Sequence, residues 1–172
     1  DIDTTELMED GARLEKITDY ILAHHHRKTH SREFTAMFCT NNVPTLIKYV
    51  DLFKKKKAEG KHNLNIATIF SYGTNEDDAG ANGIINFEKD FDSLDLNAVA
   101  EPNVSFEIYP HSREKLDEYI EDYNQLFGTK YSTKDSISYY NYYNDVSKKV
   151  KDRKIDILVV VNMFLTGFDS PT

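Results

Sequence analysis

The run of aliphatic residues from Ile155 to Val161 constrains the fold of this chain more than any other segment. Its side chains are mostly β-branched, which is typical of a strand that is buried on both faces of a parallel sheet. A small polar group follows, formed by Thr166, Gly167 and Asp169. Open parallel sheets bind ligands at the carboxyl ends of their strands. The sequence therefore predicts a buried strand that leads into a binding site.

The rest of the chain alternates between strand-like and helix-like segments. Capping residues and apolar periodicity predict helices that begin near Asp10, Asn42, Ser112 and Lys134. These helices are expected to end near Thr29, Gly60, Gly128 and Lys151, and strands are expected at 34–39, 64–70 and 155–161. This order predicts an α/β fold in which helices flank a parallel sheet.

Length and composition limit the kind of protein that this chain can form. The 172 residues are enough for one domain with a core, and the single cysteine, Cys39, excludes an intrachain disulfide framework. Cys39 lies in a strand-like run, so we expect a small buried side chain rather than a reactive thiol.

The net charge of −8 argues against a protein whose whole surface binds nucleic acid, although it is compatible with a single DNA-facing edge. We found no signal-peptide pattern and no apolar run that could span a membrane, so we expect no membrane contact.

Three stretches of the chain resemble one family. The nonapeptide FTAMFCTNN, residues 34–42, resembles helicase motif IV of the motor (R, or HsdR) subunit of type I restriction enzymes. The string VVVNMFLTGFDSPT, residues 159–172, is similar to motif V of the same family. Residues 122–129 and 142–150 resemble the segment that precedes motif V. The resemblance runs from about Leu14 to Thr172 and is weakest across residues 75–102.

The resemblance implies a fold and a domain division. Residues 31–172 would form the second RecA-like domain of a superfamily 2 motor, and residues 1–30 would lead in from an upstream domain. Residues 75–102 are expected to be a variable insertion, because long connections inside compact domains are uncommon.

The resemblance also implies an activity for the longer protein. That protein would be an ATP- and Mg²⁺-dependent translocase on double-stranded DNA that acts with methylase and specificity subunits in a bacterial or archaeal cytoplasm. Its first RecA-like domain would close on the second, and a nuclease domain would cut the DNA. Phosphoryl transfer needs a phosphate cradle and metal-holding acids, but the chain has no GxxxxGK[ST] loop and no DEAD-like box. We therefore expect no catalytic residue in this chain and no activity from it alone.

The turn after the last strand is the first candidate site. By similarity, Thr166 would contact a DNA phosphate, Gly167 would keep the turn close to the cleft between the motor domains, and Asp169 would help to read the nucleotide or orient an arginine downstream. The residues themselves leave a structural alternative open, in which Asp169 caps a helix after an ordinary turn.

Polar residues after the other two strands form the second candidate site. By similarity, Thr40 and Asn41 would face the DNA track, while Asn42 is the better helix cap. Ser71 follows the second strand and shares the same sheet edge, so a phosphate contact is possible there as well. Simple helix capping by this group is the alternative.

Three further clusters favour structural roles. His24, His25 and His26 are consecutive on a helix, so they cannot converge on one metal ion. The basic end of the last helix, Lys148 to Lys154, follows a group of tyrosines at 139–143 that either stack on single strands or belong to the core. Acidic residues at 76–78 do not follow an EF-hand pattern, so we expect no metal site.

Two other functions remain compatible with the residues. The domain could belong to another superfamily 2 helicase that acts on a different nucleic acid. It could also be a binding module without catalysis that uses the same sheet edge for a nucleotide or a nucleic acid.

Overall fold

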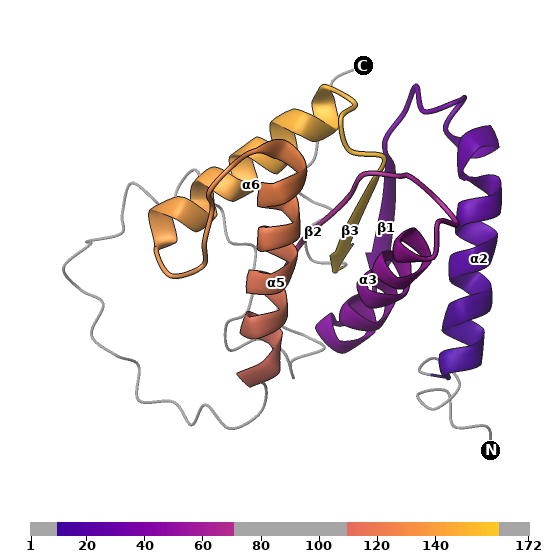
Figure 1. Cartoon of the computed structure of the whole chain (residues 1–172), viewed down its shortest axis with the longest axis horizontal. Coiled ribbons are helices and arrows are strands. Elements are labelled where there is room, and N and C mark those ends of the chain that lie inside the picture. The colour runs from indigo at the N-terminus through magenta and orange to yellow at the C-terminus, as the bar shows by residue number, and fades with distance from the viewer. Residues whose placement is uncertain (1–9, 71–109, 162–172) are drawn as a thin grey trace.

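The computed structural model describes residues 10–70 and 110–161, which form a parallel sheet of three strands flanked by helices (Figure 1). The strands are β1 (Ala36–Thr40), β2 (Ile66–Ile69) and β3 (Ile157–Val161), arranged in the order β1-β3-β2. The helices are α2 (Gly11–Lys28), α3 (Val43–Ala58), α5 (Pro110–Phe127) and α6 (Ser136–Lys151). The expected α/β fold with a parallel sheet is confirmed. None of these four helices is long and apolar enough to cross a membrane.

The central strand is the one that the aliphatic run predicts. All five residues of β3 are buried, and residues 157–160 are completely inaccessible to solvent. Both neighbouring strands pair with it in parallel, with Thr40 opposite Val161 and Ile69 opposite Val160. The sequence predicts that the strand starts at Ile155, but the ladder begins at Ile157, because Ile155 and Asp156 contact the connections that lead into the sheet.

Helices α2 and α3 follow their predicted caps. The side chain of Asp10 accepts a hydrogen bond from the amide of Arg13, and that of Asn42 accepts one from the amide of Thr45. Helix α3 packs on β1 and β3, and α2 packs on α3 (Figure 1). Helix α5 packs on α3 and β2.

Lys56 departs from the sequence-based expectation. The sequence places Lys54 to Lys57 in the last turn of the helix, where cations are favoured by its dipole, but the side chain of Lys56 is only 1% exposed. Its ammonium lies 2.5 Å from Asp19 and 3.4 Å from Glu15, which are about half exposed on α2. The hydrogen bond with Asp19 raises the pKa of Lys56. Lys56 therefore links α3 to α2 through ion pairs, in addition to any favourable interaction with the dipole of α3.

The start of α5 also differs from the prediction. Ser112 is the expected cap of this helix, but α5 begins at Pro110, and Ser112 is buried within its first turn. Gly128 follows the last residue of α5 with a φ of +69°, as expected for a residue that ends a helix in the left-handed region. Asp135 caps α6 by accepting hydrogen bonds from the amides of Ile137 and Ser138.

Tyr142 is the central residue of the buried face of α6. The sequence places Tyr139, Tyr143, Val146 and Val150 on this face, but Tyr142 is completely buried and the two predicted tyrosines are only partly covered. Its hydroxyl donates to the carbonyl of Thr68 at 2.6 Å, and the hydroxyl of Tyr139 donates to the carbonyl of Phe70 at 2.8 Å. Thr68 lies in β2 and Phe70 directly follows this edge strand. Helix α6 therefore supplies hydrogen-bond donors to carbonyls of β2 that do not pair with β3.

Removal of the Tyr142 hydroxyl should destabilise the protein. In a Tyr142→Phe variant the ring remains, but the buried carbonyl of Thr68 loses its donor. We expect a loss of about 1–3 kcal/mol in the free energy of unfolding, measured by urea denaturation. Tyr20→Phe is the matched control, since Tyr20 is 59% exposed and its substitution should change stability by less than about 0.5 kcal/mol. Equal stability of the two variants would contradict the assigned role of Tyr142.

His62 should make stability depend on pH near neutrality. Its Nδ1 accepts from the amide of Leu64 at 3.1 Å, and its Nε2–H donates to the carbonyl of Phe53 at 2.9 Å. Burial lowers the pKa of His62 below its usual 6.5. The neutral ring therefore stabilises the fold fully above pH 6.5, and this contribution is lost as the pH falls towards the lower pKa of the folded state.

A His62→Asn variant tests this pH dependence. Between pH 7.5 and pH 5.5 the free energy of unfolding should fall more in the wild type than in the variant. Parallel pH profiles for the two proteins would show that His62 does not titrate in this way.

Candidate functional site

The carboxyl ends of all three strands meet at one edge of the sheet. Thr40 ends β1 beside Val161, which ends β3, and Phe70 follows Ile69 at the end of β2. In parallel α/β sheets this edge is the usual place for a ligand. The ends of β1, β2 and β3, from which the chain runs towards the predicted site residues, therefore lie side by side at this edge.

Thr40 and Asn41 lie at this edge but differ in exposure. Thr40 is 4% exposed, and its hydroxyl lies within hydrogen-bond distance of the carbonyls of Asn42 (3.1 Å) and Val160 (3.4 Å). Asn41 is exposed, and its side chain has no hydrogen-bond partner among the residues described. Of this pair, Asn41 is the one whose amide is free to bind a ligand.

The amino end of α3 adds a polar group that sequence reasoning missed. Asn42 caps the helix as predicted, by accepting the amide of Thr45 at 2.8 Å. The hydroxyl of Thr45 is buried and has no hydrogen-bond partner within the described part of the chain. A buried hydroxyl without a partner is costly, and Thr45 is only 5% exposed, so this hydroxyl is covered by the described part of the chain. A threonine three residues after a capping asparagine gives no such signal in the sequence.

The remaining predicted site residues lie outside the described residues. These are Ser71, Thr166, Gly167 and Asp169. The chain continues from β2 directly into Ser71 and from β3 towards the other three, so each follows a strand that ends at the same edge.

Cys39 and the histidines have structural roles in the described parts of the chain. Cys39 is half-buried rather than buried as the sequence predicts, and this partial burial raises the pKa of its thiol, so the thiol stays protonated at neutral pH. His25 is buried and its Nε2 lies 3.2 Å from the carbonyl of Asp156. Over residues 10–70 and 110–161, no group of three or more His, Cys, Asp or Glu residues could hold a metal ion.

The tyrosines of α6 do not form an open stacking surface. Tyr142 is completely buried, and Tyr139 and Tyr143 pack against the core. Lys148, Lys151, Arg153 and Lys154 are exposed at the other end of the same segment. The structure thus favours the core role of the tyrosines and separates them from the basic residues.

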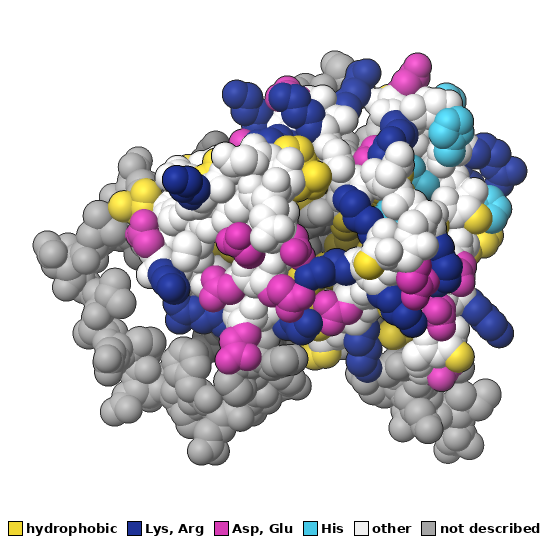
Figure 2. Space-filling view, viewed as in Figure 1, with side chains coloured by type: hydrophobic (Ala, Val, Ile, Leu, Met, Phe, Trp, Pro, Cys, Tyr) yellow, Lys and Arg dark blue, Asp and Glu magenta, His cyan; other side chains and the backbone are white. Residues whose placement is uncertain are grey.

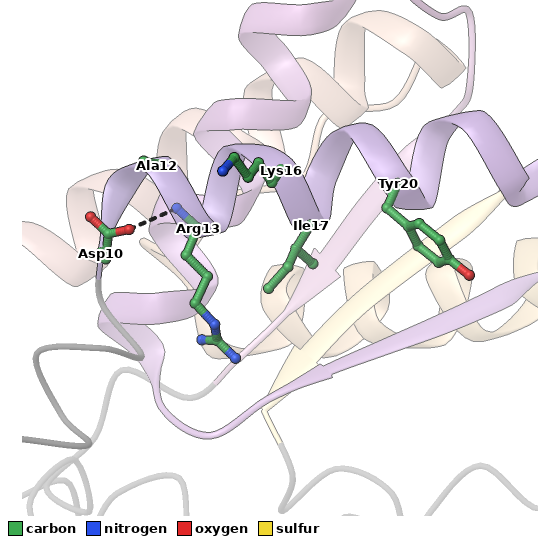
Figure 3. A pocket seen from close by; sticks show the side chains of 6 residues that line it. All are labelled: Asp10, Ala12, Arg13, Lys16, Ile17 and Tyr20. Atoms are coloured by element: carbon green, nitrogen blue, oxygen red, sulfur yellow. Dashed lines mark hydrogen bonds between the residues drawn. The ribbon is translucent and has the colours of Figure 1, made fainter. Parts of the chain in front are cut away.

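One pocket, of about 350 Å³, lies along the outer side of α2 (Figure 3). It is lined by Asp10, Ala12, Arg13, Lys16, Ile17 and Tyr20. Its carboxylate, Asp10, already accepts the amide of Arg13 as the helix cap (Figure 3). No strand end contributes to the pocket, so we do not regard it as the functional site.

Comparisons with known proteins identify a family and several relatives of this chain. Residues 32–172 match the family described as type I restriction enzyme subunit R domain 3. A type I restriction enzyme endonuclease subunit from Staphylococcus aureus strain COL is 38% identical over 170 residues, and one from Staphylococcus saprophyticus is 39% identical over 170 residues. Each alignment covers 98% of this chain but only 16% of the relative.

The order of the elements, the parallel sheet and the family match thus point the same way. The chain belongs to the family of type I restriction enzyme subunit R domain 3, and it corresponds to part of an R subunit.

Proposed function

We propose that this chain is the second RecA-like motor domain of a type I restriction enzyme R subunit, which translocates double-stranded DNA with ATP and cleaves it. Family membership supports the restriction role, because the relatives are named as endonuclease subunits. The sheet edge supports the motor role, because the predicted DNA and nucleotide residues follow strands that end side by side. That convergence is the observation on which the proposal depends most.

The proposed division of the chain is the one that the sequence suggests. Residues 1–30 lead in from the upstream motor domain, and residues 31–172 form the RecA-like domain with a variable insertion at about 75–102. The longer protein acts in the cytoplasm with methylase and specificity subunits.

In this proposal the DNA contacts come from the ends of β1, β2 and β3. The Asn41 amide and the hydroxyls of Ser71 and Thr166 would donate to phosphate oxygens, which are the groups that such side chains commonly bind. Thr40 is also a predicted DNA-binding residue, but its hydroxyl already lies within hydrogen-bond distance of two backbone carbonyls. It would therefore hold the turn that presents Asn41.

Gly167 and Asp169 would face the nucleotide across the cleft between the two motor domains. ATP with Mg²⁺ supplies the phosphoryl group whose hydrolysis drives opening and closing of that cleft. The sequence contains no GxxxxGK[ST] loop and no DEAD-like box, so the metal ligands and the phosphate cradle would come from the first RecA-like domain. The chain alone would accordingly be inactive.

Asp169→Ala tests the nucleotide role. In the full-length R subunit, assembled with its methylase and specificity subunits, DNA-stimulated ATPase activity should fall roughly tenfold or more, because a positioned charge at the cleft is lost. Asp135→Ala is the matched control: Asp135 caps α6, so its loss should lower stability by about 1 kcal/mol and leave turnover per folded enzyme unchanged. If Asp169→Ala behaves like the control, Asp169 is only a cap.

Asn41→Ala and Asn42→Ala separate DNA binding from helix capping. Asn41→Ala should raise the DNA concentration needed for half-maximal ATPase activity several-fold, because it removes a phosphate donor without disturbing the helix. Asn42→Ala should instead lower the free energy of unfolding by about 1 kcal/mol, since the amide of Thr45 loses its acceptor. Unchanged DNA dependence in a folded Asn41→Ala protein would remove Asn41 from the proposed DNA interface.

A further inference from the structure

Positive charge is concentrated at the amino edge of the sheet, opposite the proposed site. Three connections lead there from the ends of α2, α3 and α6 into β1, β2 and β3, at residues 26–33, 55–65 and 148–156. They contain twelve of the 21 Lys and Arg residues of the chain but four of its 29 Asp and Glu residues. The chain is acidic overall, with a net charge of −8, so this edge differs in charge from the rest of the molecule. Dark blue side chains gather at this end in Figure 2.

Two of these connections lie side by side. The hydroxyl of Thr35, just before β1, lies 2.7 Å from the carbonyl of Ile155 and 3.3 Å from that of Val150. Arg32 pairs with Asp156 at 2.7 Å. The ends of α2 and α6 therefore present their charges on one continuous surface.

Six exposed cations on this surface have no ion-pair partner among the described residues, and we call them the amino-edge basic surface. They are Arg27, Lys28, Lys148, Lys151, Arg153 and Lys154. In the connection from α3 to β2, Lys56 is paired with Asp19 and Lys61 with Glu59.

Helix dipoles explain only part of this surface. Cations in the last turn of a helix are favoured by the negative end of its dipole, which accounts for Arg27 and Lys28 in α2 and for Lys148 and Lys151 in α6. Arg153 and Lys154 lie beyond Asp152, which caps α6. Their charges extend the surface past the reach of the helix end.

The kind of ligand follows from the chemistry of this surface. Cations on flexible side chains bind phosphates without reading bases. Of the four adjacent tyrosines, Tyr142 is buried and Tyr139 and Tyr143 pack against the core, so these three are not available to stack on unpaired bases. We propose that the amino-edge basic surface binds the phosphate backbone of double-stranded DNA, as a second DNA-binding region on the edge opposite Asn41. This inference rests on the proposed function, because that function makes duplex DNA the substrate.

The test compares two pairs of lysines in the full-length R subunit. Lys151→Gln/Lys154→Gln removes two charges from the surface. Lys16→Gln/Lys134→Gln removes two exposed charges elsewhere, on the first half of α2 and before the opposite end of α6. The affinity for a short duplex of arbitrary sequence is measured by fluorescence anisotropy over a series of salt concentrations, without ATP.

The amino-edge variant should bind several-fold more weakly, and its slope of log affinity against log salt should be smaller by about 0.9 for each DNA phosphate that the variant no longer neutralises. The control variant should match the wild type in both quantities. Equal slopes in all three folded proteins would overturn the proposal. Because no ATP is present, a failure of the motor function would be seen separately, as absent DNA-stimulated ATPase activity in the wild type.

A photo-crosslinker identifies the partner directly. Benzoylphenylalanine in place of Lys151, in the assembled restriction complex with DNA, should form a covalent adduct with the duplex. An adduct with a protein segment instead would show that the surface binds an acidic protein face, and would overturn the DNA assignment.

Discussion

The carboxylate of Asp156 holds together the starts of all three strands. Its two oxygens accept from the guanidinium of Arg32 at 2.8 and 2.7 Å, and one of them also accepts the amide of Asn65 at 2.7 Å. Its own backbone bonds Asn65 at 2.8 Å and Ala36 at 2.9 Å, immediately beside β2 and β1. A bidentate pair of this kind is strong and directional. The carboxylate and the backbone of Asp156 thus join the residues that lead into β1 and β2 to the start of β3.

The same interaction stabilises a strained connection. His30, Ser31 and Arg32 have φ values of 48°, 62° and 72°, although none of them is glycine. The left-handed region costs such residues about 1 kcal/mol each, so the turn needs compensating interactions. Arg32 supplies them through Asp156 and through the carbonyl of Asn63 at 3.3 Å. Since Asp156 is only 9% exposed, loss of Arg32 alone would leave a nearly buried charge without its main partner.

The two edges of the sheet thus differ in physical character. At the amino edge, side chains close the hydrogen-bond network between the connections and leave a surface of cations that lack ion-pair partners within the described ranges. At the carboxyl edge, the amide of Asn41 and the buried hydroxyl of Thr45 have no partner among the described residues. The exposed amide of Asn41 at the end of β1 suits a binding role, and the hydrogen-bonded connections of the amino edge hold the proposed second DNA-binding surface in place. This difference fits the proposed motor domain, which would hold DNA while it transmits force.

Sequence patterns located most elements because their signals are local. Asp10, Asn42 and Gly128 act within one turn of their helices, so their roles follow from neighbours in the chain. The sequence misjudges Lys56 and Tyr142 because their partners lie on other elements: Asp19 on α2 and Thr68 on β2. The same limit applies to the candidate site, where only the local features were predictable from the sequence. The sequence indicated which residues follow each strand, but not that Thr40 would turn inward and Asn41 outward.

The sequence by itself determined the α/β class, the burial of the last strand and the family, since these depend on periodicity, composition and ordered motifs. Only the tertiary structure decided that β3 lies between β1 and β2, that Asp156 joins their starts, and that the basic ends of α2 and α6 form one surface. The physical reason is distance along the chain. Asp156 and Arg32 are 124 positions apart, and an interaction of that kind depends on how the whole chain packs rather than on any local preference.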